Sequence, residues 1–130
     1  MIVVDASATI NLLFRSKGSV QIELTLASGE PLSAPDHMLV ETTRVIRRQH
    51  LAGKIELDAA SEMVADALAL GIKPHSCGDL IPRAWELRDQ FTLDDALYVA
   101  LAEALEGELL TSDRKLASHA KRFVDVSVVG

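Results

Sequence analysis

The sequence predicts an α/β protein whose central, mostly parallel sheet is covered by helices on both faces. Short apolar runs alternate with longer amphipathic segments along the whole chain, which is the pattern of successive crossover connections. At 130 residues the chain is expected to form a single domain, residues 1–130, around one buried core.

Five short strands are expected. They cover residues 2–4, 32–34, 72–75, 108–111 and 124–129. The run Ile2-Val3-Val4 is rich in β-branched side chains, which is typical of a buried parallel strand. Pro35 ends the second strand. Pro74 has no amide proton, so it restricts the third strand to an edge or an end of the sheet.

Seven helices are expected to connect and follow these strands. They cover residues 8–14, 20–27, 37–51, 58–69, 80–91, 93–105 and 114–121. Ser7, Asp36 and Thr92 lie immediately before three of them as N-cap candidates, and Gly53 follows the end of the third helix. Pro82 can be accommodated only in the first turn of its helix.

The composition is that of a globular protein. A hydrophobic fraction of 48% with 25% charged residues excludes a disordered chain. Aromatic residues make up only 4%, so the core must be aliphatic and surfaces for base stacking are scarce. Cys77 is the only cysteine, which excludes an intramolecular disulfide and a cysteine-based zinc site.

Neither a membrane segment nor a signal peptide is expected. The longest apolar stretch, residues 96–102, is far shorter than the ~20 residues that span a bilayer. No basic segment precedes the N-terminal apolar run, and Asp5 interrupts that run at once. We therefore expect a cytoplasmic protein.

Four acidic residues far apart in the sequence lie at the edges of apolar segments. They are Asp5, Glu41, Asp95 and Asp113. A carboxylate at the end of a strand lies at the rim of the sheet, where open α/β folds bind ligands. Carboxylates gathered there repel one another unless a cation holds them, and oxygen-only sites suit Mg²⁺ or Mn²⁺. The pattern therefore indicates a metal-dependent enzyme.

The net charge of −6 argues against broad, non-specific binding of nucleic acid. If the four acids hold a metal, the rest of the chain carries only −2. The thirteen Lys and Arg residues can then still form a local basic rim.

Each of the four acids also has a purely structural explanation. Asp5 and Asp113 precede expected helices and can act as caps. Glu41 shares a helix stripe with Arg44 and Arg48, and such a stripe is often a solvated set of ion pairs. Asp95 is the third helical residue after Thr92, in an arrangement similar to a capping box, although its side of the helix is apolar.

The chain resembles PIN-domain ribonucleases, and specifically the short VapC-type toxins of prokaryotic toxin–antitoxin pairs. The segments that carry the resemblance are Ile2-Val3-Val4-Asp5-Ala6-Ser7, Glu41 in the long helix, Thr92-Leu93-Asp94-Asp95-Ala96-Leu97-Tyr98-Val99-Ala100-Leu101-Ala102-Glu103 and Leu109-Leu110-Thr111-Ser112-Asp113-Arg114-Lys115-Leu116. The acid followed by Ala-Leu-Tyr-Val-Ala-Leu-Ala is the most specific of these. The resemblance implies a three-layer α/β/α sandwich.

The resemblance also implies the roles of the acids. Asp5, Asp95 and Asp113 would hold one or two Mg²⁺ or Mn²⁺ ions, and Glu41 would orient or deprotonate the attacking water. Asp94 is the second candidate for the position assigned to Asp95. Thr111 and Ser112 match a position where a hydroxyl orders the site. Hydrolysis of an RNA phosphodiester by this route would leave a 5′-phosphate and a 3′-hydroxyl.

The partners implied by the resemblance are an RNA substrate, a small VapB-like antitoxin and a second copy of the chain. Apolar residues of the first two helices either form a groove for an antitoxin helix or belong to the core: Ile10, Leu13, Phe14, Val20 and Leu24. Candidate backbone contacts to RNA are Arg44, Arg48, Arg114 and Lys115. The histidines, at 37, 50, 75 and 119, show no pairing pattern and are expected to be surface or packing residues.

Three alternatives were considered. A haloacid-dehalogenase-like phosphatase needs a second aspartate two residues after the first, where this chain has Ser7. A response-regulator receiver needs a phosphoacceptor aspartate at the end of its third strand, whereas residues 50–60 are expected to be helical. A catalytically silent PIN-like scaffold would not require all four acids.

Overall fold

The chain folds around a five-stranded sheet, seen here in a computed structural model that describes residues 1–130. The strands are β1 (Ile2–Val4), β2 (Leu32–Pro35), β3 (Lys73–His75), β4 (Glu108–Thr111) and β5 (Asp125–Val128). Their order across the sheet is β3-β2-β1-β4-β5, and every neighbouring pair is parallel. The prediction of a parallel sheet is therefore confirmed, and β3, which contains Pro74, is an edge strand as expected.

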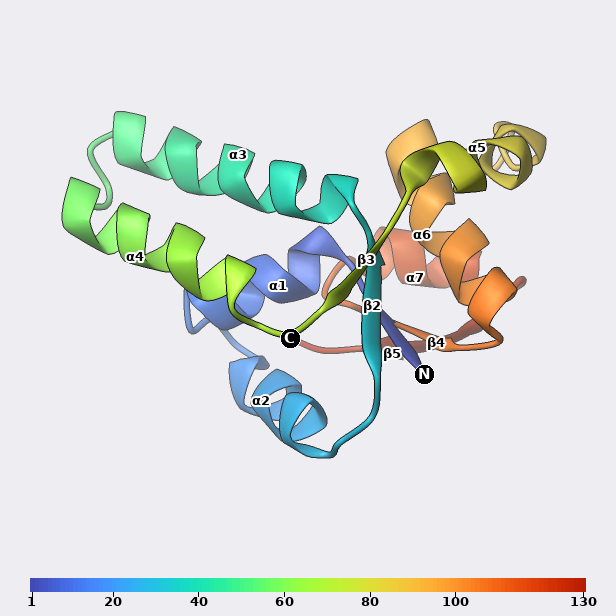
Figure 1. The fold of residues 1–130 in the computed structure, drawn as a ribbon, viewed down its shortest axis with the longest axis horizontal. Helices are drawn as coiled ribbons and strands as arrows, with labels where there is room; N and C mark the ends of the chain where they lie inside the picture. Colours follow the sequence, from blue (N-terminus) through green and yellow to red (C-terminus); the bar gives the residue numbers. More distant parts are fainter.

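Seven helices connect the strands. They are α1 (Ala6–Leu13), α2 (Ser19–Ala27), α3 (His37–Leu51), α4 (Leu57–Leu68), α5 (Cys77–Glu86), α6 (Leu93–Leu105) and α7 (Arg114–Ala120). Figure 1 shows α1 to α4 on one side of the sheet and α5 to α7 on the other. This is the three-layer α/β/α arrangement that the resemblance implies. None of the helices combines the length and apolar character needed to cross a bilayer.

The alternation of side chains along the central strands divides the core into two parts. Val3 and Leu109 face the larger cluster, which is built mainly from α5, α6 and α7. Val4 and Leu110 face the opposite side, where they meet α1 and α2. Successive residues of a strand point to opposite faces, so continuous apolar runs supply both layers.

The α6 helix is the central element of the larger cluster. Its seven consecutive residues from Ala96 to Ala102 are all buried. Such a continuous run excludes an amphipathic surface helix and explains why this segment reads as apolar throughout. Burial of α6 also fixes the position of its first turn, which carries Asp95.

The chain reverses direction across the sheet between β1 and β4. From β1 it builds β2 and β3 on one side, and it then crosses to place β4 and β5 on the other. The register pairs Val4 with Leu110, so β1 and β4 end side by side. A crevice at the carboxyl ends of strands at such a switch point is the common ligand site of open α/β sheets.

Three local predictions were wrong. Ser7 is not an N-cap, because Asp5 caps α1 instead by accepting from the Ala8 amide at 2.9 Å. Asp36 occupies the N-cap position of α3 but accepts from the Cys77 amide at 3.3 Å rather than from its own helix. Pro82 is the sixth residue of α5, because this helix begins at Cys77 and not at residue 80.

The end of α5 also differs from the prediction. The helix ends at Glu86, and residues 87–90 continue as turns. Leu87 and Phe91 are both buried in the larger cluster and hold these turns against the core. Packing against the core therefore ends the helix at Glu86, although the apolar pattern continues to Phe91.

Candidate functional site

Asp5 is the most deeply buried of the four predicted acids. It directly follows β1, and only 3% of its surface is exposed. Its Oδ1 accepts from the Ser7 hydroxyl at 2.7 Å and from the Ala8 amide at 2.9 Å. Its Oδ2 accepts from the Thr111 hydroxyl at 2.5 Å. These contacts join the ends of β1 and β4 through one carboxylate.

The hydroxyls around Asp5 form a continuous network. Ser7 Oγ lies 3.1 Å from Thr111 Oγ1 and accepts from the Ser112 amide at 2.9 Å. Thr111 Oγ1 in turn accepts from the Asp113 amide at 3.0 Å. The loop after β4 is therefore held against the first turn of α1. Thr111 orders this region directly, whereas Ser112 does so mainly through its backbone.

Burial raises the pKa of Asp5. Loss of hydration is the main cause and brings the pKa from 3.8 to about 6, although the hydrogen bonds from Thr111, Ala8 and Ser7 oppose the shift. The negative charge of Asp113 raises it further. A buried carboxylate in this position gains free energy from any cation that binds beside it.

Asp113 is the N-cap of α7. Its Oδ1 accepts from the amides of Lys115 and Leu116, both at 3.0 Å. The structural explanation for this residue therefore holds, and it does not compete with a role in the site. The capping bonds use one carboxylate oxygen, and Oδ2 takes no part in them.

Asp95 lies in the first turn of α6 and is partly buried. Its amide donates to the Thr92 hydroxyl at 3.2 Å, which confirms Thr92 as the N-cap. Desolvation raises the pKa of Asp95, and the charges of Asp113 and Glu41 raise it further. Asp94 is exposed and adds a further negative charge beside Asp95, whereas Asp95 is partly buried and interacts with Asp113 and Glu41.

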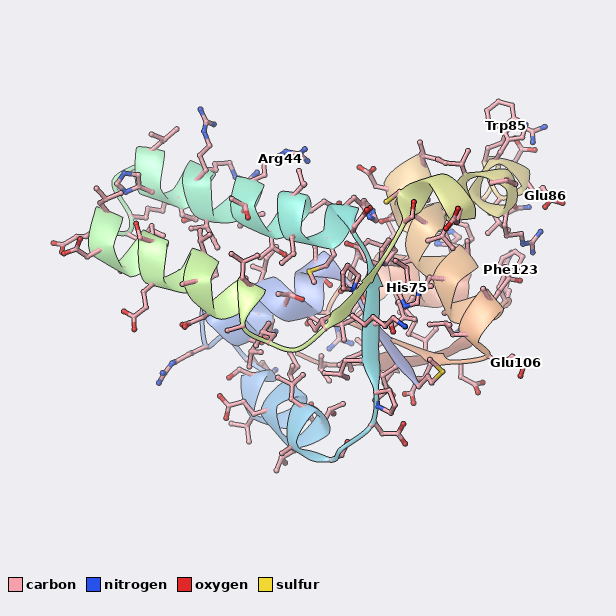
Figure 2. The ribbon with its side chains drawn as sticks, in the orientation of Figure 1. Arg44, His75, Trp85, Glu86, Glu106 and Phe123 are labelled. Atoms are coloured by element: carbon pink, nitrogen blue, oxygen red, sulfur yellow. The ribbon has the colours of Figure 1, made fainter.

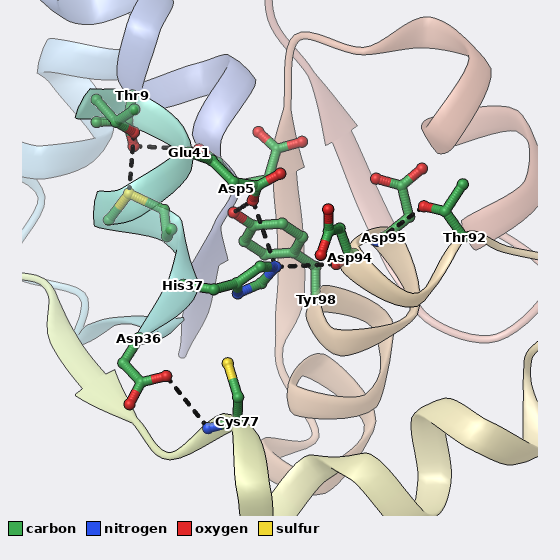
Figure 3. Close-up of polar contacts among 12 residues, drawn as sticks. Asp5, Thr9, Asp36, His37, Glu41, Cys77, Thr92, Asp94, Asp95 and Tyr98 are labelled. Carbon is green, nitrogen blue, oxygen red and sulfur yellow. Dashed lines mark hydrogen bonds and ion pairs between the residues drawn. The ribbon is translucent and has the colours of Figure 1, made fainter. Parts of the chain in front are cut away.

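Glu41 is held by two aromatic side chains rather than by arginines. The Tyr98 hydroxyl donates to its Oε1 at 2.6 Å, and His37 Nε2 lies 3.3 Å from the same oxygen. Figure 3 shows these three side chains together beside Asp5. Glu41 makes no ion pair with Arg44 or Arg48, so the explanation of a salt-bridged stripe is wrong.

His37 is the residue of the site that the sequence did not indicate. Its ring lies against Tyr98 with centroids 4.7 Å apart, and its Nε2 is 3.1 Å from the backbone oxygen of Asp94. It therefore ties the start of α3 to the start of α6. The i, i+4 spacing from His37 to Glu41 was the one available signal, and it places both on one side of the helix.

The other histidines contact the main chain or a single hydroxyl, as expected for packing residues. His50 contacts the Ile55 carbonyl at 3.0 Å, His75 contacts Ser33 Oγ at 3.1 Å, and His119 contacts the Lys115 carbonyl at 2.9 Å. None of these three contacts any of the four acids.

The predicted basic residues divide into two groups. Lys115 lines a pocket together with Asp95 and Asp113. Arg114 instead reaches the carbonyl of Gly130 at 3.5 Å. Arg44 and Arg48 are exposed on α3, and Figure 2 shows Arg44 pointing outward from that helix. Of these four predicted basic residues, only Lys115 therefore lies beside the acidic group.

The donor chemistry of the four acids suits a hard divalent cation. All are oxygen donors, and their mutual effects on pKa join Asp5, Asp113, Asp95 and Glu41 into one electrostatic group. No three such side chains are close enough to hold one ion as they lie. An ion shared by three of them would therefore need side-chain rotations relative to this arrangement.

Comparison with known proteins agrees with this architecture. The PIN domain family model matches residues 2–122. The chain is 41% identical to Ribonuclease VapC1 of Mycobacterium tuberculosis over 120 residues, covering 89% of this chain and 88% of the relative. It is 32% identical to Ribonuclease VapC12 of the same organism over 129 residues, covering 99% of both chains.

Among solved structures, the fold is similar to that of VapBC2 from Rickettsia felis, described as bound to a DNA fragment from their promoter. The TM-score is 0.71 with 16% sequence identity, and the match covers all of both chains, 100% each. At this identity the likeness concerns the fold alone.

Proposed function

The chain belongs to the PIN domain family, and from this premise we infer that it is a VapC-like endoribonuclease of a toxin–antitoxin pair. It is a hydrolase that cleaves RNA phosphodiester bonds. Relatives named as ribonucleases at 32% and 41% identity support this assignment over most of the chain. The observation that carries it is the convergence of four acids from distant segments at the ends of β1 and β4.

Asp5, Asp95 and Asp113 would hold a divalent ion, Mg²⁺ or Mn²⁺. Such an ion lowers the pKa of a bound water and stabilises negative charge on the phosphate oxygens. Asp5 is the fixed member of the set because three hydrogen bonds hold it in one orientation. Asp95 and Asp113, from the starts of α6 and α7, complete the set from the more exposed side.

Glu41 would act on the attacking water. The Tyr98 hydroxyl and His37 both contact Oε1, which leaves Oε2 to accept a proton from that water. Tyr98 remains a hydrogen-bond donor throughout, because burial and the neighbouring Glu41 raise its pKa far above neutrality. Attack by water needs no 2′-hydroxyl, so the products carry a 5′-phosphate and a 3′-hydroxyl.

The decisive experiment is a cleavage assay with RNA in the presence of Mg²⁺ or Mn²⁺. Wild type should cut, Asp5→Ala should not, and the matched exposed variant Asp94→Ala should cut like wild type. Mapping the new ends should show 5′-phosphates. Full activity in Asp5→Ala, or no metal-dependent cleavage by wild type, contradicts the proposal and leaves the silent scaffold as the better explanation.

The antitoxin partner is expected to bind the outer side of α2. Val20 and Leu24 lie one helical turn apart there, and each is 66% exposed. Ile10 packs against the larger core cluster and belongs to the core, but Leu13 and Phe14 of the neighbouring segment are only partly buried. Together they offer an apolar surface for an amphipathic helix. Co-expression of the cognate antitoxin with Val20→Asp/Leu24→Asp tests this, since binding should be lost while the free protein still cleaves RNA.

Homodimerisation and a cytoplasmic location also remain proposals. Light scattering at several concentrations measures the first, and fractionation of cells that express the chain measures the second.

A further inference from the structure

A pocket of about 460 Å³ opens on one side of the acidic group. It lies between the turns that join α5 to α6 and the outer face of α7. Asp95 and Asp113 form the end next to the proposed metal. The volume lies within the range of sites that enclose a small organic ligand, about 300 to 1,000 Å³.

The remaining wall of this pocket carries cationic and hydrogen-bonding groups. Arg88 comes from the turn after α5, whereas Lys115 and His119 lie one helical turn apart on α7. Gln90 adds an amide, and Phe91 and Leu116 supply the apolar surface. The pocket therefore combines acids next to the proposed metal with nearby cations, which suits a ligand that carries more than one phosphate.

The cations of this wall are not neutralised by the protein. The ion pairs of the structure involve the N-terminus, His37 and Arg83, and neither Arg88 nor Lys115 takes part in one. Arg88 is held in place by stacking on Trp85 at 4.6 Å and by donating to the Trp85 carbonyl at 2.9 Å. His119 uses Nδ1 on the Lys115 carbonyl, so its Nε2 is available to a ligand.

We propose that this pocket is the subsite for the nucleotide next to the scissile bond, with Arg88 and Lys115 holding its outer phosphate. The inference rests on the proposed ribonuclease function and adds the direction in which the strand leaves the acidic group. The negative charge of the whole chain is compatible with it, because two local cations suffice to guide a single-stranded backbone past the acids. The carboxylate of Asp89, on the same wall, repels the RNA backbone and weakens its binding.

The test measures RNA binding apart from cleavage. The probe is a fluorescein-labelled single-stranded RNA of mixed sequence and 20 nucleotides, and its anisotropy is followed at several salt concentrations with Mg²⁺ present. All proteins carry Asp5→Asn so that the probe stays intact. Arg88→Ala/Lys115→Ala is compared with Arg47→Ala/Lys54→Ala, which removes two exposed positive charges from α3 and the loop after it.

The pocket variant should bind about tenfold more weakly than its parent at low salt. The slope of log K against log salt should fall by about 0.7, the value for one lost phosphate contact on a single strand. The control pair should change neither quantity appreciably, and Asp89→Asn should tighten binding. Equal binding by the pocket and control variants, or no RNA binding at all, overturns the subsite.

Cleavage by otherwise wild-type proteins separates the two proposals. Efficient cleavage with unchanged KM in Arg88→Ala/Lys115→Ala overturns the subsite and leaves the ribonuclease function standing. Binding that depends on the pocket, without cleavage by wild type, refutes the ribonuclease function and leaves the pocket as an RNA-binding site.

Discussion

Replacing Asp5 with asparagine should make the metal-free protein more stable at neutral pH while abolishing its activity. The Asp5 side chain is almost fully buried, and its pKa is raised from 3.8 to about 6, chiefly by desolvation. Ionising it in the folded state therefore costs about 3 kcal/mol relative to the unfolded chain. Asparagine has nearly the same shape and carries no charge, so it removes this cost.

The hydrogen-bond network can accept most of the polar groups of the amide. The amide oxygen keeps the bonds from Ser7 and Ala8 that Oδ1 now accepts. The amide nitrogen then donates to Thr111 Oγ1, whose own proton turns toward Ser7 Oγ at 3.1 Å. The second amide proton finds no acceptor in this network, so the stabilisation should be smaller than about 3 kcal/mol, while the stability difference should still grow with pH.

The pH dependence gives the sharper measurement. A carboxyl whose folded pKa is raised stabilises the native state below its unfolded pKa, and this stabilisation is lost as the pH rises through the folded pKa. The advantage of Asp5→Asn should therefore be near zero at about pH 4, grow up to about pH 6 and then stay constant. Urea unfolding of both proteins in EDTA across this range measures the difference, with Asp94→Asn as the exposed control.

Two outcomes would refute this reasoning. One is an Asp5→Asn protein that is no more stable than wild type at pH 7 without metal. The other is a stability difference that does not vary between pH 4 and pH 7. Either would mean that the Asp5 carboxylate is already compensated within the folded chain.

Three further predictions concern the same site. Millimolar Mg²⁺ or Mn²⁺ should raise the melting temperature of wild type by mass action and leave that of Asp5→Asn unchanged, which calorimetry measures; an equal rise in both would place the bound ion elsewhere. Tyr98→Phe removes the hydrogen bond to Glu41, so kcat should fall about tenfold, with stability lowered by about 1 kcal/mol; an unchanged kcat would mean that Glu41 needs no fixed orientation. Ser7→Ala leaves the Ser112 amide without its acceptor and should destabilise the protein by about 1 to 3 kcal/mol, measured by chemical denaturation. The exposed Ser118→Ala is the control. Equal stability of the two variants would show that a water replaces the Ser7 hydroxyl.

Much of the fold could be predicted because its signals are local. The helices at residues 37–51 and 93–105 and the strand at 108–111 have the predicted bounds. Gly53 and Gly107 lie two residues after the ends of the two helices, and Gly107 directly precedes the strand. The boundaries of α5 were missed because Leu87 and Phe91 continue a helical pattern while packing as turns in the core.

The site could be predicted in part for the same reason. Asp5, Asp95 and Asp113 follow recognisable strands and caps, so their positions at the ends of elements are visible in the sequence. The partners of Glu41 were not visible. Tyr98 lies 57 residues away on another helix, and His37 reaches across to the same element, so only the packing of α3 on α6 reveals the contact.

The order of strands and helices, and the acids at their ends, follow from local features of the chain, because hydrophobic period, caps and breakers act within a few residues. Which acids lie close together, and how far their pKa values shift, depends on the packing of the whole chain. The sheet order brings Asp5 beside Thr111 and Asp113, burial raises the pKa of Asp5, and α6 supplies Tyr98 to hold Glu41. Desolvation and proximity are properties of the packed molecule, and they turn four separate carboxylates into one electrostatic group.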